Sequence, residues 1–135
     1  PWSNCFGENA SCDYYGCSGI KVNTSSSSPV VAIVKRYGKV VKHAYISAGS
    51  SYTFELKDGT YQVFFYHGTS WNSRKKMSSD ECSSLYGGWD YNEEVTKDDE
   101  SITFSTSSRG TYTYTLSSVI NGNFNTKSRS IKEAL

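Results

Sequence analysis

Hydrophobic and polar residues alternate with a period of two through the middle of the chain. Tyr52, Phe54 and Leu56 alternate with polar residues, and the alternation resumes over residues 60–67, after Asp58-Gly59. A period of two places alternate side chains on one face of a β-strand. Asp-Gly between two such runs is typical of a tight turn, because glycine accepts the positive φ that the turn requires. The pattern therefore predicts an antiparallel hairpin with an aromatic inner face.

Five further segments have the length and composition of strands. Residues 30–36 are apolar at both parities, which is typical of a strand that is buried on both faces. The predicted strands cover residues 20–22, 30–36, 40–46, 52–57, 60–67, 102–104 and 112–116. Seven short strands without a long helix between them predict an all-β fold, a single antiparallel β-sandwich. A small barrel is the alternative.

The alternation lapses in two parts of the chain. Residues 1–19 are rich in Gly, Asn, Ser and Cys and are expected to form a Cys-rich arm before a β-sandwich domain of residues 20–135. Residues 68–100 contain glycines, tryptophans, a basic run and an acidic run. We expect them to form a long irregular excursion with a short helix near residues 79–85, and such segments are often functional. The sequence Ser-x-x-Glu at residues 130–133 has the form of a capping box and predicts a short terminal helix.

The chain has four cysteines, Cys5, Cys12, Cys17 and Cys82. An even number in a chain rich in tyrosine, serine and threonine favours disulfides and an oxidising compartment, which is extracellular, periplasmic or at the cell surface. We expect one bridge to join the amino-terminal arm to the loop around Cys82. The alternatives are a four-thiolate zinc site, although the C-x2-C spacing is lacking, and thiols that are free or only partly paired.

Size and charge exclude several classes of protein. A chain of 135 residues suits one domain. A net charge of +1 argues against a nucleic-acid-binding protein. The longest apolar run, residues 30–34, is far shorter than the roughly 20 residues of a membrane-spanning helix. We therefore expect a protein that does not span a membrane.

Side chains suited to catalysis are sparse. The two histidines, His43 and His67, lie on or at the ends of predicted strands, and no G-x-S-x-G nucleophile motif is present. Carboxylates cluster at residues 93–94 and 98–100, where we expect solvated loops. A weak calcium site or a glycan-cleaving pair of carboxylates is the alternative there. We expect a protein that is not an enzyme and that carries no cofactor.

Aromatic and basic residues in the segment 68–100 are the candidate binding residues. Tryptophan and tyrosine on a loop held by a rigid sandwich are typical anchors for a partner. The candidates are Trp71, Arg74, Lys75, Lys76, Tyr86, Trp89 and Tyr91. The alternative is that Trp71 and Trp89 fold back and plug one end of the sandwich, because exposed tryptophan is costly in water.

Several segments resemble a family of uncharacterised bacterial β-sandwich proteins. They are GKVVKHAYI at residues 38–46, DGTYQVFFY at 58–66, WN at 71–72, KKM at 75–77 and NGNF at 121–124. Residues 52–63 are also similar, more loosely, to the hairpin of prealbumin-like and PEGA-like modules of bacterial envelope proteins. Such modules serve as spacers or adhesive domains, so the resemblance implies a non-catalytic envelope module. The tryptophan-rich stretch after His67 departs from that pattern, and no binding mode is carried over.

Together these features predict an exported, non-catalytic recognition module that binds a protein partner through its aromatic and basic loop. One alternative is a carbohydrate-binding module, which would need two or three coplanar rings on an exposed face. Another is an immunity or inhibitor protein that neutralises a toxin or a hydrolase. The sequence leaves the partner's identity and the oligomeric state open.

Overall fold

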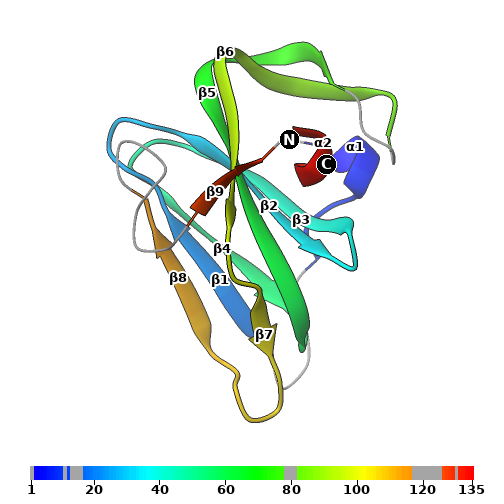
Figure 1. Ribbon diagram of the computed structural model, residues 1–135, viewed down its shortest axis with the longest axis vertical. Helices are drawn as coiled ribbons and strands as arrows, with labels where there is room; N and C mark the ends of the chain where they lie inside the picture. The colour runs from blue at the N-terminus through cyan, green and yellow to red at the C-terminus, as the bar shows by residue number, and fades with distance from the viewer. Residues whose placement is uncertain (1, 11, 13–16, 78–81, 117–125, 130) are drawn as a thin grey trace.

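The computed structural model describes residues 2–10, 12, 17–77, 82–116, 126–129 and 131–135 (Figure 1). The elements are, in chain order, α1 (Ser3–Phe6), β1 (Ser18–Asn23), β2 (Val30–Arg36), β3 (Lys39–Ile46), β4 (Ser51–Leu56), β5 (Gly59–Met77), β6 (Leu85–Asp98), β7 (Ile102–Phe104), β8 (Thr111–Thr115), β9 (Thr126–Arg129) and α2 (Ile131–Ala134). The predicted all-β sandwich is confirmed, and all seven predicted strands are present. The expected terminal helix is α2, although Ser130, its predicted cap, lies outside the described residues.

The strands form two packed sheets. The smaller sheet has the order β4-β1-β8, and the larger has the order β3-β2-β5-β6-β9, with β7 paired to the start of β5. Neighbouring strands are antiparallel except β1 and β8, which run parallel with Ile20 opposite Tyr112. This parallel pair departs from the purely antiparallel prediction. It arises because the chain crosses from the larger sheet at β7 to the edge of the smaller sheet at β8, so no tight turn joins β8 to its neighbour β1.

The predicted hairpin at Asp58-Gly59 is wrong in its pairing. β4 pairs with β1 in the smaller sheet, whereas β5 pairs with β2 and β6 in the larger one. Asp58-Gly59 is therefore a corner at which the chain changes sheets. Phe54 and Val63 still face one common core, as the alternation predicts. A period of two specifies which face is buried and not which strand lies alongside, so a hairpin and a corner give the same pattern.

Arg109 fastens this corner to the loop between β7 and β8. Its Nε and Nη2 donate hydrogen bonds of 3.0 and 2.8 Å to the two carboxylate oxygens of Asp58. Both side chains are about one-third exposed. The pairing lowers the pKa of Asp58, because the guanidinium favours the ionised carboxylate. Solvent screening keeps the contribution of such a surface pair small.

The core between the sheets is built from alternate residues of strands in both layers. It comprises Ile20, Val22, Val30, Ala32, Val34, Ala44, Ile46, Phe54, Leu56, Tyr61, Val63, Phe65, Ile102, Phe104, Tyr114 and Leu116. A hydrogen bond of 2.5 Å from the Tyr114 hydroxyl to Asp98 Oδ2 joins the smaller sheet to the larger. The other oxygen, Oδ1, accepts the backbone N–H of Glu100. Both oxygens of the buried Asp98 carboxylate thus accept hydrogen bonds. The prediction of a solvated acidic loop at residues 98–100 is therefore wrong for Asp98.

The larger sheet buries its other face as well. On this side α1, α2 and the outer part of β5 and β6 cover a second apolar cluster (Figure 1). Its members are Trp2, Val31, Ile33, Val40, Phe64, Tyr66, Met77, Leu85, Trp89, Val95, Ala134 and Leu135. β2 therefore contributes its even-numbered residues to one core and its odd-numbered residues to the other. This confirms the prediction, from its apolar residues at both parities, of a strand buried on both faces.

The structure differs from the sequence expectation over residues 68–100. Most of this segment is regular, because β5 continues to Met77 and pairs with β6. The register shifts between His67 and Thr69 and between Asn72 and Lys76, and these irregularities break the alternation that a strand prediction needs. The predicted helix near 79–85 falls partly outside the described residues, and Leu85 already begins β6.

Both pairs of cysteines form disulfides. Cys5–Cys82 joins α1 to the chain between β5 and β6, and Cys12–Cys17 closes a short loop in the arm. All four thiols are used, so the alternatives of a zinc site and of free thiols are wrong. The expected bridge between the arm and the Cys82 loop is confirmed. The described helices, of four residues each, are far too short to span a membrane.

The arm also pairs with the outer edge of β3 at His43. Asn9 Oδ1 accepts the backbone N–H of His43 at 3.1 Å, and Asn9 Nδ2 donates to the His43 carbonyl at 2.6 Å. The side-chain amide thus makes the two hydrogen bonds that a neighbouring strand would make. Asn9 Nδ2 also donates to the Tyr52 hydroxyl at 3.1 Å, which connects the arm to β4.

Candidate functional site

The outer part of β5 and β6 forms a projection that carries every predicted binding residue. We call residues 68–77 of β5 and 85–93 of β6 the distal hairpin. It extends beyond the sandwich and bends over towards α1 (Figure 1). The Cys5–Cys82 bridge holds its far end to α1. The bend also requires glycine, because a Cβ at Gly68 would lie 2.6 Å from the Cβ of Trp89.

Trp89 is a core residue and not an exposed anchor. Its side chain is 2% exposed, and its indole N–H donates to the Tyr66 carbonyl at 3.2 Å. Its backbone N–H donates to the Tyr66 hydroxyl at 2.9 Å. Trp89 thus folds back, as the alternative prediction has it, but it packs in the outer apolar cluster and not at the end of the sandwich, and it leaves the set of candidate binding residues.

Trp71 lies partly buried against the same cluster. Its ring centroid is 5.1 Å from that of Trp89 with the planes 74° apart, and 5.2 Å from that of Tyr45 with the planes 54° apart. These are edge-to-face and tilted packing geometries. The three rings therefore do not form the flat platform that the carbohydrate-binding alternative needs.

Lys75 is drawn inward by a polar network beneath the hairpin. Its Nζ lies 2.9 Å from Glu93 Oε2 and also donates to the Trp89 carbonyl. The Tyr66 hydroxyl donates to the same carboxylate oxygen of Glu93. Burial raises the pKa of Tyr66, and the hydrogen bond to Glu93 raises it further, so the phenol remains a donor. The charge of Lys75 is matched internally, which makes Lys75 a structural residue.

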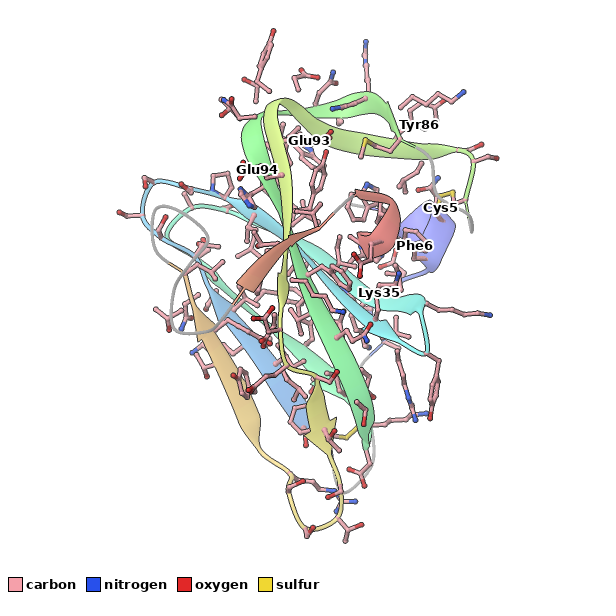
Figure 2. The ribbon with its side chains drawn as sticks, viewed as in Figure 1. Cys5, Phe6, Lys35, Tyr86, Glu93 and Glu94 are labelled. Atoms are coloured by element: carbon pink, nitrogen blue, oxygen red, sulfur yellow. A yellow bond between two sulfur atoms is a disulfide. The ribbon has the colours of Figure 1, made fainter. Side chains whose placement is uncertain are left out.

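Four of the predicted binding residues are exposed on the distal hairpin. Tyr86 is 50% and Tyr91 is 65% exposed, and Arg74 and Lys76 are also exposed. Lys76 and Tyr86 are direct cross-strand partners, so their side chains share one face. Figure 2 shows Tyr86 on the outside of the hairpin near its disulfide-bonded end. Across the described part of the chain, neither Arg74 nor Lys76 has a carboxylate within ion-pair distance.

The backbone that carries Arg74 is held by side chains of the hairpin itself. Asn72 Oδ1 accepts the Arg74 N–H at 2.9 Å, and Asn72 Nδ2 donates to Asp90 Oδ1 at 3.2 Å. This Asn72 bridge fixes the irregular stretch between the two regular parts of β5. The charged group therefore extends from an ordered backbone even though the register shifts there.

The two histidines have structural surroundings. His43 is 2% exposed, lies near the rings of Trp2 and Phe6, and places Nε2 3.1 Å from the Gly7 carbonyl. Burial lowers its pKa, because the charged form loses solvation. Burial likewise lowers the pKa of His67, whose Nε2 is 3.9 Å from Glu94. Among the described residues, no group of three or more His, Cys, Asp or Glu side chains is placed to hold a metal ion.

Sequence reasoning missed the residues that hold the hairpin down. Tyr66 and Glu93 are 27 positions apart, and the only local signal is a tyrosine at the end of an apolar run. Tyr45, which packs on both Trp71 and Trp89, gives no local signal either. These contacts depend on how the hairpin bends, and the sequence pattern does not specify that bend.

Comparisons with models of known protein families, with curated protein sequences and with solved structures gave no match. No relative therefore supplies a function or a family for this chain, and the proposal below rests on the positions of its own side chains.

Proposed function

We propose that this protein is an exported, non-catalytic recognition module that binds an acidic protein surface through Arg74, Lys76, Tyr86 and Tyr91. The observation that carries the proposal is the exposed pair of Lys76 and Tyr86 on a hairpin whose end is bonded to α1. Tyrosine and arginine are enriched among the residues that dominate protein–protein binding energy. A lysine without an internal carboxylate supplies charge for steering a partner.

The rigidity of the distal hairpin supports this role. Trp89 and the Tyr66–Glu93–Lys75 network fasten its inner side, and the disulfide fastens its end. A surface that is ordered before binding loses less conformational freedom on binding, which favours affinity. The same buried contacts explain why only four of the seven candidate residues, and not Trp71, Lys75 or Trp89, belong to the proposed surface.

A protein partner suits the surface better than a glycan. Sugar rings stack on flat aromatic faces, whereas Trp71 is tilted against both Tyr45 and Trp89 and is partly buried. The four exposed candidate residues are instead tyrosines and cations, which suit a partner with carboxylates. The two disulfides are compatible with an extracellular or periplasmic location, and we include export in the proposal.

The test is capture of a partner from the secreted and envelope fractions of the source organism. The immobilised chain, the double variant Arg74→Glu/Lys76→Glu and the variant Tyr86→Ala are compared at low and high salt. Lys39→Glu is the matched control, because Lys39 is exposed on β3 and outside the distal hairpin. All substituted residues are exposed, so thermal unfolding should remain close to that of the parent chain.

We expect one acidic protein to be retained by the parent chain and by Lys39→Glu. Retention should fall by about tenfold or more in the double variant and in Tyr86→Ala, as is usual for residues that dominate an interface. Equal retention by all four proteins would refute the surface. Identification of the captured protein as a toxin, a hydrolase or an envelope component would separate an inhibitor from an envelope module.

A further inference from the structure

A pocket outside the distal hairpin lies between the arm, β3 and the end of β4. Its volume is about 180 Å³. Val41, Leu56 and the ring of Tyr61 provide apolar walls. An apolar cavity of roughly 150 Å³ is large enough to hold a benzene molecule. The pocket therefore has room for a compact group of about that size.

Arg36 is held in a fixed position at this pocket. Its guanidinium carbon lies 5.0 Å from the ring centroid of Tyr37 and 5.7 Å from that of Tyr61. It also packs on the backbone of Gly59, where an added Cβ would lie 2.9 Å from Arg36 Cζ. Aromatic faces attract the cation and order its planar group. The guanidinium is thus fixed in place without an ion pair among the described residues.

One donor of Arg36 is left over. Its Nε is buried, and no acceptor for it occurs among the side chains and backbone that the structure describes. This Nε is covered by its surroundings, so an anion in the pocket would be bound through the terminal Nη groups of the guanidinium, which carry the other donors. A carboxylate matches the guanidinium fork with two parallel hydrogen bonds.

The charges around the pocket favour an anion. Lys42 and Lys57 line it together with Arg36, and Glu55 is the one carboxylate among the lining residues that the structure describes. Burial lowers the pKa of Lys42, with Glu55 opposing that shift and Lys57 reinforcing it. Lys42 Nζ donates to the Ala10 carbonyl, which holds the ammonium at the arm side of the pocket. Three cations against one carboxylate leave a positive field at a partly apolar cavity.

We propose that this pocket binds a small organic carboxylate with a compact apolar body. The carboxylate would accept hydrogen bonds from Arg36, and the apolar body would contact Val41, Leu56 and Tyr61. An inorganic anion satisfies the charge and leaves the apolar walls unused. A neutral molecule of the same shape fills the walls and leaves the cations unmatched. Both features together define the ligand class.

The probe is sodium benzoate, titrated into the intact disulfide-bonded chain and followed by amide chemical shifts. Benzamide is the uncharged match in shape, and sulfate is the anion without an apolar body. We expect saturable benzoate binding localised to residues around 36, 41 and 56–61, and at least about tenfold weaker binding of the other two probes, since a bidentate charged pair and apolar burial each contribute. Equal binding of benzoate and benzamide, shifts elsewhere, or no saturable shifts would overturn the proposal.

Variants test the role of the cations. Arg36→Gln should weaken benzoate binding by about tenfold or more, because it removes the charged fork. Lys39→Gln is the matched control, since Lys39 lies opposite Arg36 in the β2–β3 register and does not line the pocket. Lys57→Gln, at an exposed position, should weaken binding less, and Glu55→Gln should strengthen it.

Lys57 and Glu55 are exposed, so Lys57→Gln and Glu55→Gln test the proposal even if Arg36→Gln disturbs the fold. Unchanged affinity in both Lys57→Gln and Glu55→Gln, or an equal loss in Arg36→Gln and Lys39→Gln, would overturn the proposal. The binding surface on the distal hairpin shares none of these residues, so either proposal can fail without the other.

Discussion

The two cores on either side of the larger sheet are built in different ways. The core between the sheets consists of alternate strand residues, and every member lies between residues 20 and 116. The outer core joins segments from near both ends of the chain, Trp2, Ala134 and Leu135, with the distal hairpin. It is fastened by a disulfide and by hydrogen-bonded aromatic residues. The first core is held mainly by apolar strand packing, with the Tyr114–Asp98 hydrogen bond between the sheets, whereas the second also depends on a disulfide and on a polar network.

This contrast implies a difference in local stability. Helices of four residues are not stable alone, and the distal hairpin projects beyond the sandwich, so the order of both depends on what they pack against. We expect the sandwich to unfold only globally and the outer core to open more easily. Each prediction below alters one core and compares it with the other, from the largest effect to the smallest.

The largest effect is expected in the core between the sheets. Phe54→Ala should lower the free energy of unfolding by about 3–5 kcal/mol, because it leaves a cavity among side chains of both sheets. Urea denaturation followed by circular dichroism measures the change. Tyr37→Ala is the control, because Tyr37 is 87% exposed. A loss below about 1 kcal/mol for Phe54→Ala would contradict the assignment of this core.

Removal of the Cys5–Cys82 bridge should act on the outer core. The double variant Cys5→Ser/Cys82→Ser should lose about 2–4 kcal/mol of stability, because the bridge closes a long loop. Hydrogen exchange should accelerate in α1 and in the distal hairpin and remain slow in β1, β2 and β4. Uniform acceleration in all strands would show that the two cores unfold as one unit. Cys12→Ser/Cys17→Ser is the control, because that bridge joins neighbouring positions within the arm.

The network under the distal hairpin should give an intermediate effect. Tyr66→Phe removes the donor to Glu93 and the acceptor of the Trp89 N–H, which leaves that buried N–H unpaired. We expect a loss of about 1–3 kcal/mol and faster exchange at Trp89. Glu94→Gln is the control, since Glu94 is largely exposed. If Tyr66→Phe were as stable as the parent chain, the Tyr66–Glu93–Lys75 network would not stabilise the distal hairpin.

The smallest effect is a dependence on pH. Burial lowers the pKa of His43 and of His67 in the folded chain, so below the ordinary value of about 6.5 the unfolded chain binds protons more tightly. Their contribution to stability is complete above pH 6.5 and is lost as the pH falls through the folded pKa values. His43→Gln should reduce the fall in the free energy of unfolding below pH 6.5, and His67→Gln should reduce it independently. A fall unchanged by either variant would contradict this assignment.

The sequence predicted every described strand except β6 and β9, and it predicted which faces of those strands are buried, because period-two patterns are local. The predicted pairing of the strands on either side of Asp58-Gly59 is wrong, because a corner between two sheets has the same sequence pattern as a hairpin. β6 was missed because its glycines and charges obscure the alternation. At the candidate site, Arg74, Lys76, Tyr86 and Tyr91 are exposed, as binding residues must be, and their role in binding stays a prediction. The inward positions of Lys75 and Trp89 could not be predicted, because they depend on contacts with Tyr66 and Glu93 far away in the sequence.

The amide of Asn9 has a consequence for how copies of this chain meet. An open strand edge recruits other chains into a growing sheet, and proteins guard such edges. Because Asn9 occupies the N–H and the carbonyl of His43, the outer edge of β3 has fewer free backbone groups for hydrogen bonds to an incoming strand. A single asparagine in the arm thus occupies two backbone groups that an incoming strand would otherwise use to extend the sheet.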